Sequence, residues 1–227
     1  RGAFQTLKAS LRQAHKLGYL ENNPLQNLTF GDVTPAKVEP KTSALQTCQL
    51  EELKRHIETL PMPLSVLSFL CTGYLTRASE TLLSTWNHMD WSQAIWRIPA
   101  AHTKTGVALS HPLTPDMITL LKSYKHWQRQ HVGRSRFLFP RKSGYKPMTA
   151  SAAAHQLKRA SSGRFTLHDL RKFGSSHLRD KGVDYYVVER ILNHQKTQLD
   201  HTYIQSTLQT LIRKHLNAYH SNLFMPP

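Results

Sequence analysis

The sequence predicts a mainly α-helical fold with a small antiparallel β-sheet, an α+β class. Apolar residues recur at spacings of three and four through most of the chain from residue 43 onward, which is the period of helices with one buried face. One stretch, WNHMDWSQAIWRIPAAHTKTGVALSHPLT (residues 86–114), breaks this period with short runs bounded by Ser, Gly and Pro, and these runs indicate the sheet. With 227 residues, 39% of them hydrophobic, the chain is long enough for one sizeable domain and a smaller piece.

A single helix is expected at the start of the chain, where a stripe of apolar residues runs through residues 3–20: Phe4, Leu7, Leu11 and Ala14. The following segment, ENNPLQNLTFGDVTPAKVEPKT, contains three prolines and is typical of an extended linker. Because a lone helix before a linker cannot form a core, we expect residues 1–28 to be the last helix of a truncated domain. Residues 29–44 are then the linker, and residues 45–227 form the main domain with a C-terminal helix.

Helices are expected to make up most of the main domain. TCQLEELKRHIETL has Thr47 as a candidate N-cap and an apolar stripe of Leu50, Leu53 and Ile57. Further helices are predicted over residues 62–72, 77–85, 115–131 and 149–159. The apolar run MPLSVLSFLCTGYL is too short to span a bilayer and is interpreted as a buried helix. In the region of the sheet, three tryptophans are expected to pack in the sheet or the core: Trp86, Trp91 and Trp96.

The segment FTLHDLRKFGSSHLRDKGVDYYVVERILNH predicts two consecutive helices. In the first, four residues at spacings of three and four form one buried stripe: Leu167, Leu170, Gly174 and Leu178. His168 and Arg171 are three residues apart, so both project from a neighbouring face of that helix.

Residues on either side of the second helix indicate where it begins and ends. Gly182 ends the preceding helix and Asp184 can cap the next one. Three apolar residues are expected to point inward: Val183, Val187 and Ile191. The helix then delivers Asn193 and His194 at its C-terminal end.

The charge of the chain favours a polyanionic partner. Its formal net charge is +16, and nucleic acid is the commonest polyanion that such a field attracts. Between Asp116 and Asp169 there is no carboxylate, whereas an ordinary solvated face mixes signs. Eleven cations lie in that interval: Lys122, Lys125, Arg129, Arg134, Arg136, Arg141, Lys142, Lys146, Lys158, Arg159 and Arg164. A phosphate backbone would neutralise them, although a merely soluble basic protein is the alternative.

Metal, disulfide and membrane chemistry have no sequence signal. Cys48 and Cys71 give neither a disulfide framework nor zinc spacing, which indicates a reducing compartment such as the cytoplasm. His215 and His220 lie on the C-terminal segment STLQTLIRKHLNAYHSNLF, which predicts an amphipathic helix, and we interpret them as a solvated pair rather than a metal site. The apolar stripe of this helix comprises Leu208, Leu211, Ile212 and Leu216.

Several of these segments together resemble the tyrosine recombinases, the phage integrase family. HDLR (168–171), LNH (192–194) and the tyrosine nine residues after His194 resemble the C-terminal signature of that family. TGYLTRASE (72–80) is similar to its first arginine box, and WRIPAAHTKTGVALSHPL to the β-hairpin that carries its lysine, here Lys104. The resemblance covers roughly residues 45–220 and implies a tyrosine recombinase catalytic-domain fold, of the DNA breaking-rejoining enzyme type, preceded by the end of a core-binding domain. The sequence departs from the family at Asn193, where many members have glycine, and around Arg77.

The chemistry expected of such a set can also be argued from the side chains. A tyrosine hydroxyl has a reference pKa near 10, so its ionisation at neutral pH costs roughly 4 kcal/mol and Tyr203 needs cationic surroundings or a base. Arg77 and Arg171 suit a phosphate, since each guanidinium can give two parallel hydrogen bonds. The resemblance implies that Lys104 protonates the departing 5′ oxygen, that His168 acts as base or donor, and that His194 bonds a non-bridging oxygen. The resemblance further implies that the product is a 3′-phosphotyrosine.

Each assignment has a plainer alternative. Arg77 could pair with Glu80 on a helix surface, Lys104 could be an ordinary hairpin lysine, and His194 could be a helix C-cap. His168 and Arg171 could be surface groups. Three tyrosines compete with Tyr203 as nucleophile: Tyr185, Tyr186 and Tyr219. Glu80 and Asp169 are expected to orient the arginine and the histidine rather than to react.

The resulting hypothesis is a site-specific recombinase that integrates or excises a mobile element. The alternatives are a type IB topoisomerase-like nicking-closing enzyme and a non-catalytic DNA-binding module. Expected partners are duplex DNA with attachment sites, further copies of the chain in a tetramer on DNA, and a directionality factor or host DNA-bending protein. No metal or cofactor is expected, and the C-terminal helix docks in this family onto a neighbouring protomer or, alternatively, within its own chain. The residues expected to bind DNA are Lys122, Lys142, Lys146, Arg159 and Arg164.

Overall fold

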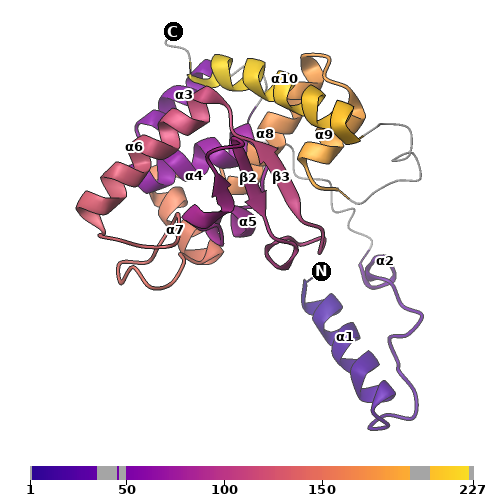
Figure 1. Ribbon diagram of the computed structural model, residues 1–227. Coiled ribbons are helices and arrows are strands. Elements are labelled where there is room, and N and C mark those ends of the chain that lie inside the picture. The colour runs from indigo at the N-terminus through magenta and orange to yellow at the C-terminus, as the bar shows by residue number, and fades with distance from the viewer. Residues whose placement is uncertain (1, 35–44, 46–49, 195–204, 225–227) are drawn as a thin grey trace. The chain divides into compact units, whose positions relative to one another are not determined.

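The structure, a computed structural model, describes residues 2–34, 45, 50–194 and 205–224. The chain divides into two units, Arg1–Thr42 and Ser43–Pro227, and Figure 1 labels most of their helices and strands. The mainly helical fold with a small antiparallel sheet that the sequence predicts is confirmed.

The smaller unit contains α1 (Gly2–Lys16) and α2 (Phe30–Val33). Helix α1 ends before Gly18, whose positive φ of 78° reverses the chain, so the helix is shorter than the apolar pattern suggested. Its apolar stripe is not buried: Leu7 is 53% exposed, and Phe4 makes only an edge contact with Phe30, at 5.8 Å between ring centroids. Helix α2 lies within the segment predicted as a linker, where Thr29 and Asp32 form a capping box.

A buried helix, α4 (Met62–Gly73), organises the larger unit. Ten of its twelve residues are buried, as the uninterrupted apolar run predicted. Helices α3 (Leu50–Glu58), α5 (Ala78–Leu82) and α8 (Leu167–Asp180) pack against it, as do α6 (Pro115–His131) and α7 (Ala150–Ala160). The candidate cap Thr47 lies outside the described residues.

The sheet has three antiparallel strands in the order β1-β2-β3: β1 (Met89–Asp90), β2 (Ile95–Ile98) and β3 (Leu109–Pro112). Trp96 pairs with Met89 on one side and His111 on the other, and its side chain is fully buried. Trp86 is also in the core, and Trp91 packs against it, as expected from the sequence.

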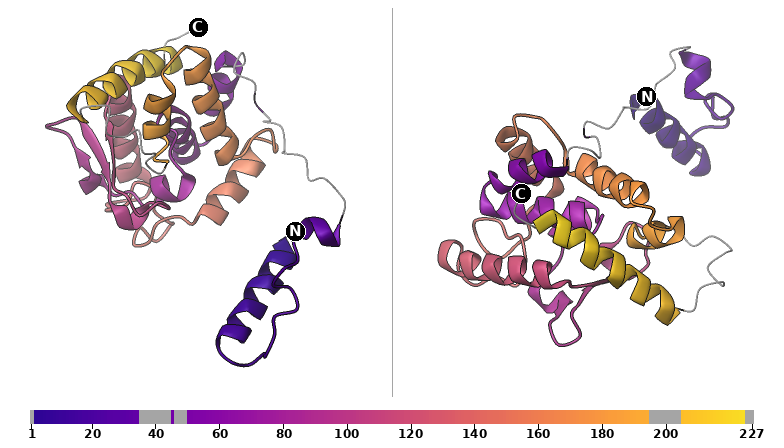
Figure 2. Two further views of the ribbon diagram at one scale, coloured as in Figure 1. Left: turned by 90° about the vertical axis from the view of Figure 1, so that its right-hand side faces the viewer. Right: turned by 90° about the horizontal axis from the view of Figure 1, so that it is seen from above.

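Helix α10 (Gln205–Phe224) runs across the top of the larger unit in Figure 1, along β3, α6 and α4 of its own chain. The view from above in Figure 2 shows α6 and α8 on either side of it. Five of its side chains are buried hydrophobics: Leu208, Ile212, Leu216, Tyr219 and Leu223.

One histidine of α10 lies in the core rather than in solvent. His220 is fully buried, with Nδ1 2.8 Å from Thr114 Oγ1 and Nε2 3.0 Å from the Gly73 carbonyl oxygen. The interpretation of His215 and His220 as a solvated pair is therefore wrong for His220. It falls four residues after Leu216, on the face of the helix that packs inward.

Candidate active site

Arg171 is the centre of the candidate site. Its Nη1 donates to the carbonyl oxygen of Leu75, and its Nη2 donates to the carbonyl oxygen of Leu192 at 2.9 Å. The same Nη2 lies 3.3 Å from Nε2 of His194. The residue is 6% exposed, so the alternative of a surface arginine is excluded. Burial first, and then the positive charge of Arg77, lower the pKa of Arg171 to about 10, which leaves the guanidinium charged at neutral pH.

The position of Arg171 follows from the close packing of α8 on α4. The stripe of α8 is buried as predicted, α8 packs against α4, and Gly174 lies close to the end of α4. A side chain there would overlap the carbonyl oxygen of Thr72 and the side chain of Leu75. The absence of a Cβ therefore lets α8 approach far enough for Arg171, three residues earlier, to reach the backbone after α4.

Leu75 has a left-handed backbone, with φ 54°. This conformation costs a residue with a side chain about 1–2 kcal/mol. Leu75 is fully buried, and its carbonyl accepts from Arg171, so packing and a charged hydrogen bond hold the turn in place. The turn leads directly to Arg77, which the sequence predicts to lie in the site.

Arg77 is fixed by a buried carboxylate. Glu80 is fully buried and accepts from the Arg77 backbone N at 2.9 Å and from its Nη1 at 3.0 Å. The Arg77 side chain is 25% exposed, so the pair joins a buried acid to an accessible guanidinium rather than lying on a helix surface. Nη1 alone takes part in this ion pair, and the guanidinium has further donors for a phosphate.

Helix α9 (Tyr185–Ile191) ends in the turn that carries His194. The N–H of His194 donates to the Glu189 carbonyl, and that of Asn193 to the Arg190 carbonyl, which is the pattern of a Schellman C-cap. Asn193 occupies its left-handed position with φ 51°, as expected of an asparagine that replaces glycine. Asp184 caps the start of the helix by accepting from the Tyr186 N–H at 2.8 Å.

Sequence reasoning missed the carboxylate that orients His194. Glu189 Oε2 lies 2.6 Å from His194 Nδ1, and Oε1 accepts from Arg179 at 2.7 Å. Because a carboxylate accepts here, Nδ1 carries a proton and Nε2 faces Arg171. No local motif marks this pair, since the residues meet only through the turn after α9.

His168 lies on the exposed side of α8, where the charges of Arg171 and Arg77 affect its pKa. Partial burial lowers its pKa most, followed by the charges of Lys172 and Arg171, with a smaller effect of Arg77 in the same direction. The charge of Asp169 opposes the shift. The imidazole is therefore neutral at neutral pH and can accept a proton.

Asp169 caps α8. Its Oδ2 accepts from the Thr166 N–H at 3.0 Å and from the Thr166 hydroxyl at 2.7 Å, while its own N–H donates to that hydroxyl at 3.2 Å. These bonds form a capping box. The carboxylate therefore hydrogen-bonds the helix N-terminus, and its negative charge affects the pKa of His168.

Lys104 is exposed in the loop between β2 and β3, which confirms that it lies on a hairpin. The neighbouring Thr105 accepts a hydrogen bond from the side chain of Asn193 at 3.1 Å. The loop of Lys104 is thereby attached to the turn of His194.

Tyr203 lies outside the described residues. Of the competing tyrosines, Tyr219 is 3% exposed and donates to the Thr72 carbonyl at 3.3 Å, and burial raises its pKa, so it is unsuited to attack a phosphate. Tyr185 and Tyr186 lie at the start of α9, at the opposite end from His194.

The segment without carboxylates presents its charges to solvent. All five residues expected to bind DNA are exposed: Lys122 on α6, Lys142 and Lys146 before α7, Arg159 in the last turn of α7, and Arg164 before α8. Of the eleven cations in the segment, only Lys125 is partly buried, with its ammonium 5.0 Å from the centre of the Trp86 ring. In the described part of the chain none of the eleven forms an ion pair with a carboxylate.

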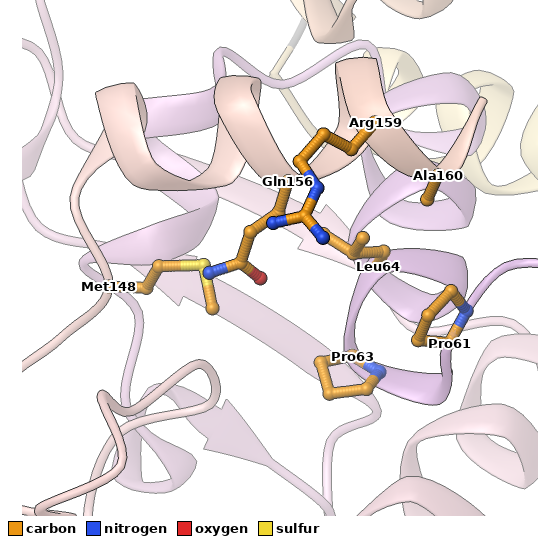
Figure 3. Close-up of a pocket in the computed structure, with 7 residues that line it drawn as sticks. All are labelled: Pro61, Pro63, Leu64, Met148, Gln156, Arg159 and Ala160. Atoms are coloured by element: carbon orange, nitrogen blue, oxygen red, sulfur yellow. The ribbon is translucent and has the colours of Figure 1, made fainter. Parts of the chain in front are cut away.

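A pocket of about 400 Å³ lies between α4 and α7 (Figure 3), and its lining includes none of the residues that contact Arg171. Arg159 extends over it, and Pro61, Pro63 and Leu64 form an apolar wall. Within the described residues no group of His, Cys, Asp or Glu side chains is arranged to hold a metal ion. No helix in that part of the chain is long and apolar enough to cross a membrane.

This chain belongs to the phage integrase family, whose profile matches residues 43–210. Among curated relatives it is similar to prophage integrase IntA of Escherichia coli, with 25% identity over 216 residues that cover 91% of this chain and 51% of that protein. The chain therefore spans about half the length of this relative.

Two solved structures share the fold. The integrase of transposon Tn1549, in complex with a circular intermediate DNA, is 19% identical with a TM-score of 0.67, over 85% of this chain and 70% of that one. A lambda integrase tetramer bound to a Holliday junction is 17% identical with a TM-score of 0.63, over 86% of this chain and 57% of that one. At these identities the similarity shows the fold alone.

Proposed function

We propose that the chain cleaves and rejoins DNA strands through a 3′-phosphotyrosine intermediate, as the catalytic part of a site-specific recombinase that integrates or excises a mobile element. The observation that supports this most is the surroundings of Arg171. A buried guanidinium contacts the turn before Arg77 and the turn of His194, and its charge acts on His168. Two arginines and two imidazoles from three separate segments are suited to bind one phosphate.

In the proposed reaction the Tyr203 oxygen attacks the phosphorus of a DNA strand. A P–O bond to tyrosine forms, and the P–O bond to the 5′ oxygen breaks. The phenolic proton goes to His168, whose neutral imidazole can accept it, and Lys104 gives a proton to the departing 5′ oxygen. Arg77 and Arg171 stabilise the charge on the non-bridging oxygens. A second DNA end can reverse the step, because the phosphotyrosine retains the bond.

The exposed cations between Lys122 and Arg164 are proposed to contact the DNA backbone, with the five residues named above as the principal contacts. Such contacts position a duplex without reading its sequence. Relatives bound to DNA, and the lambda integrase tetramer on a Holliday junction, support a tetramer on paired sites for this chain as well. A directionality factor or a host DNA-bending protein would act on that assembly, in the cytoplasm.

The two units of the chain fit this function. We propose that residues 1–28 end a core-binding domain, that residues 29–44 link it to the catalytic domain, and that residues 45–227 form that domain with its C-terminal helix. The larger unit holds all described residues of the candidate site. The chain spans about half of the curated relative, and the activity of the whole protein is part of this proposal.

The test is covalent capture on DNA. Denaturing the protein after incubation with DNA from its host, digesting it, and sequencing from the peptide-blocked 3′ ends would map cleavage positions. A suicide substrate built on those positions should then trap the protein as an adduct, while Tyr203→Phe should bind the same DNA and leave none. An undiminished adduct in that variant would exclude Tyr203 as the nucleophile.

Two alternatives give different results in the same system. A topoisomerase-like enzyme would relax supercoiled DNA as a monomer and would not join strands from two sites. A non-catalytic binding module would give no adduct with any DNA. Strand exchange between two mapped sites by a tetramer distinguishes the recombinase from both.

A further inference from the structure

The side chain of Asn193 joins the end of α9 to the loop that carries Lys104. Its Nδ2 donates to Thr105 Oγ1 at 3.1 Å and to the Val107 carbonyl oxygen at 3.1 Å. The carbonyl can only accept, so the amide orientation is fixed. Asn193 is 8% exposed, and these bonds connect parts of the chain that are 88 and 86 residues apart.

The loop has little else to hold it. Lys104, Gly106 and Val107 are exposed, and the loop closes on itself through Thr103, whose hydroxyl lies 2.9 Å from the Val107 carbonyl oxygen. Within the described residues, every hydrogen bond to residues 103–107 from outside the hairpin comes from Asn193. Within the described residues, the hydrogen bonds that attach the loop to the turn of His194 therefore come from one amide.

Asn193 is itself held firmly. Its left-handed backbone lies in the C-cap of α9, between Leu192, whose carbonyl accepts from Arg171, and His194, which faces the same arginine. Leu192 and His194 thus contact Arg171, and Asn193 between them contacts the loop of Lys104. A displacement of the loop would change where an ammonium on Lys104 lies relative to the phosphate-binding groups.

We propose that Asn193 is a positioning residue for general-acid catalysis, which holds the loop of Lys104 against the turn of His194. The proposal rests on the proposed strand-cleavage function. It explains why an asparagine is useful at a position where glycine would satisfy the backbone. Glycine adopts the left-handed conformation readily but has no side chain to donate.

The attachment itself can be tested without DNA. Asn193→Gly keeps the backbone geometry and removes the amide, Asn193→Asp keeps the shape and removes the donor, and Thr105→Val removes one acceptor. Amide hydrogen exchange over residues 101–108 should become about 5- to 30-fold faster in the first two variants and less so in the third, since each bond adds a modest increment to local stability. Unchanged exchange in Asn193→Gly would overturn the proposal.

The catalytic consequence is tested by changing the leaving group. A suicide substrate with sulfur in place of the bridging 5′ oxygen releases a thiolate, which needs no proton because thiols have pKa values near 8.5. With the oxygen substrate, Asn193→Gly should cleave roughly 10- to 100-fold more slowly than the unchanged protein, and Lys104→Ala about 10²- to 10⁴-fold more slowly. With sulfur, both differences should shrink to about threefold.

Controls separate positioning from general damage and from failure of the function. Tyr219→Phe removes a buried hydroxyl that bonds the Thr72 carbonyl and not the loop, and any loss of rate in this variant should be the same with both substrates. A deficit in Asn193→Gly that persists with sulfur, or a Lys104→Ala variant that cleaves the oxygen substrate at full rate, would refute the positioning role. If the unchanged protein cleaved neither substrate, the strand-cleavage function would fail, whereas the exchange measurement would still decide whether Asn193 holds the loop.

Discussion

Two buried histidines make the fold sensitive to acid. His111 on β3 is 1% exposed and His220 on α10 is fully buried, and Tyr74 contacts both rings, at 5.0 and 4.7 Å between centroids. Burial lowers the pKa of His220 to about 4. Burial, and then the charges of His220 and Arg171, lower the pKa of His111 to about 3.

The sign and size of the effect follow from these pKa values. Both lie below the ordinary value of 6.5, so the unfolded chain binds more protons than the folded one as the pH falls. Their contribution to stability is complete well above pH 6.5 and is lost as the pH falls toward 4 and 3. Between pH 8 and pH 5 each histidine removes about 2 kcal/mol from the free energy of unfolding, together about 4 kcal/mol.

The assay is urea unfolding followed by tryptophan fluorescence at pH 8, 7, 6 and 5. In His220→Gln, whose amide can still reach Thr114 and the Gly73 carbonyl, the loss between pH 8 and pH 5 should be about 2 kcal/mol smaller than in the unchanged chain. The lowered pKa values of His88 and His168 act in the same direction in both proteins, so the difference between them isolates His220. His155→Gln, at an exposed position, controls for the loss of a histidine as such.

A free energy of unfolding that stays constant from pH 8 to pH 5 would refute the coupling between these histidines and the fold. So would a His220→Gln variant that loses as much stability as the unchanged chain over that range.

Three further predictions concern the site, the packing beneath it and the DNA contact. Arg171→Lys should fold and bind DNA but cleave a suicide substrate about 10²- to 10³-fold more slowly, because an ammonium cannot bridge the carbonyls of Leu75 and Leu192 as a guanidinium does. Cleavage at the normal rate would show that Arg171 is not a catalytic residue. Gly174→Ala should lower the free energy of unfolding in urea by about 1–3 kcal/mol, since the new methyl group meets the Thr72 carbonyl, whereas the exposed Ser176→Ala should change it little. Lys142→Gln should reduce the slope of log affinity for DNA against log salt by about 1, and a slope that does not change would show that Lys142 contacts no phosphate.

Much of the architecture could be predicted because its signals are local. Helix α6 begins at Pro115, as expected, since Thr114 before it accepts from the Met117 N–H and proline suits the first turn. The break between α8 and α9 follows from Gly182, with φ 75°, and from the cap at Asp184. These residues determine where helices begin and end whatever they pack against.

The contacts that assemble the site could not be predicted in the same way. Arg171 donates to the carbonyl of Leu75, 96 residues earlier, and that bond depends on how closely α8 crosses α4. A backbone carbonyl carries no sequence signal, and neither does the reach of the Asn193 amide to the hairpin. The types and spacings of the candidate catalytic residues could therefore be predicted. Of the groups that hold them, Glu80, three residues after Arg77, could be predicted too, whereas the distant backbone carbonyls and the Asn193 amide could not.

For Asp169 and His220 the sequence contained a pattern that indicated a different contact from the one expected. Asp169 was expected to orient His168, yet Thr166 three residues before it forms with it a capping box, a pattern visible in the sequence. His220 continues the stripe of Ile212 and Leu216, which marks the inner face of α10. In both cases the position in the helix determined the contacts, and the chemistry of the side chain was secondary.

The turn of residues 192–194 has a consequence for how this chain tolerates changes in length. Leu192 contributes a carbonyl and His194 an imidazole to Nη2 of Arg171, while Asn193 between them donates its amide to the hairpin, and the C-cap of α9 sets their order. Inserting or deleting one residue here would move every following group to a new angle about the helix axis, so no single neighbour could compensate. A library of one-residue insertions and deletions along the chain should therefore find this tripeptide among the least permissive sites, while the exposed loop at residues 141–147 accepts them.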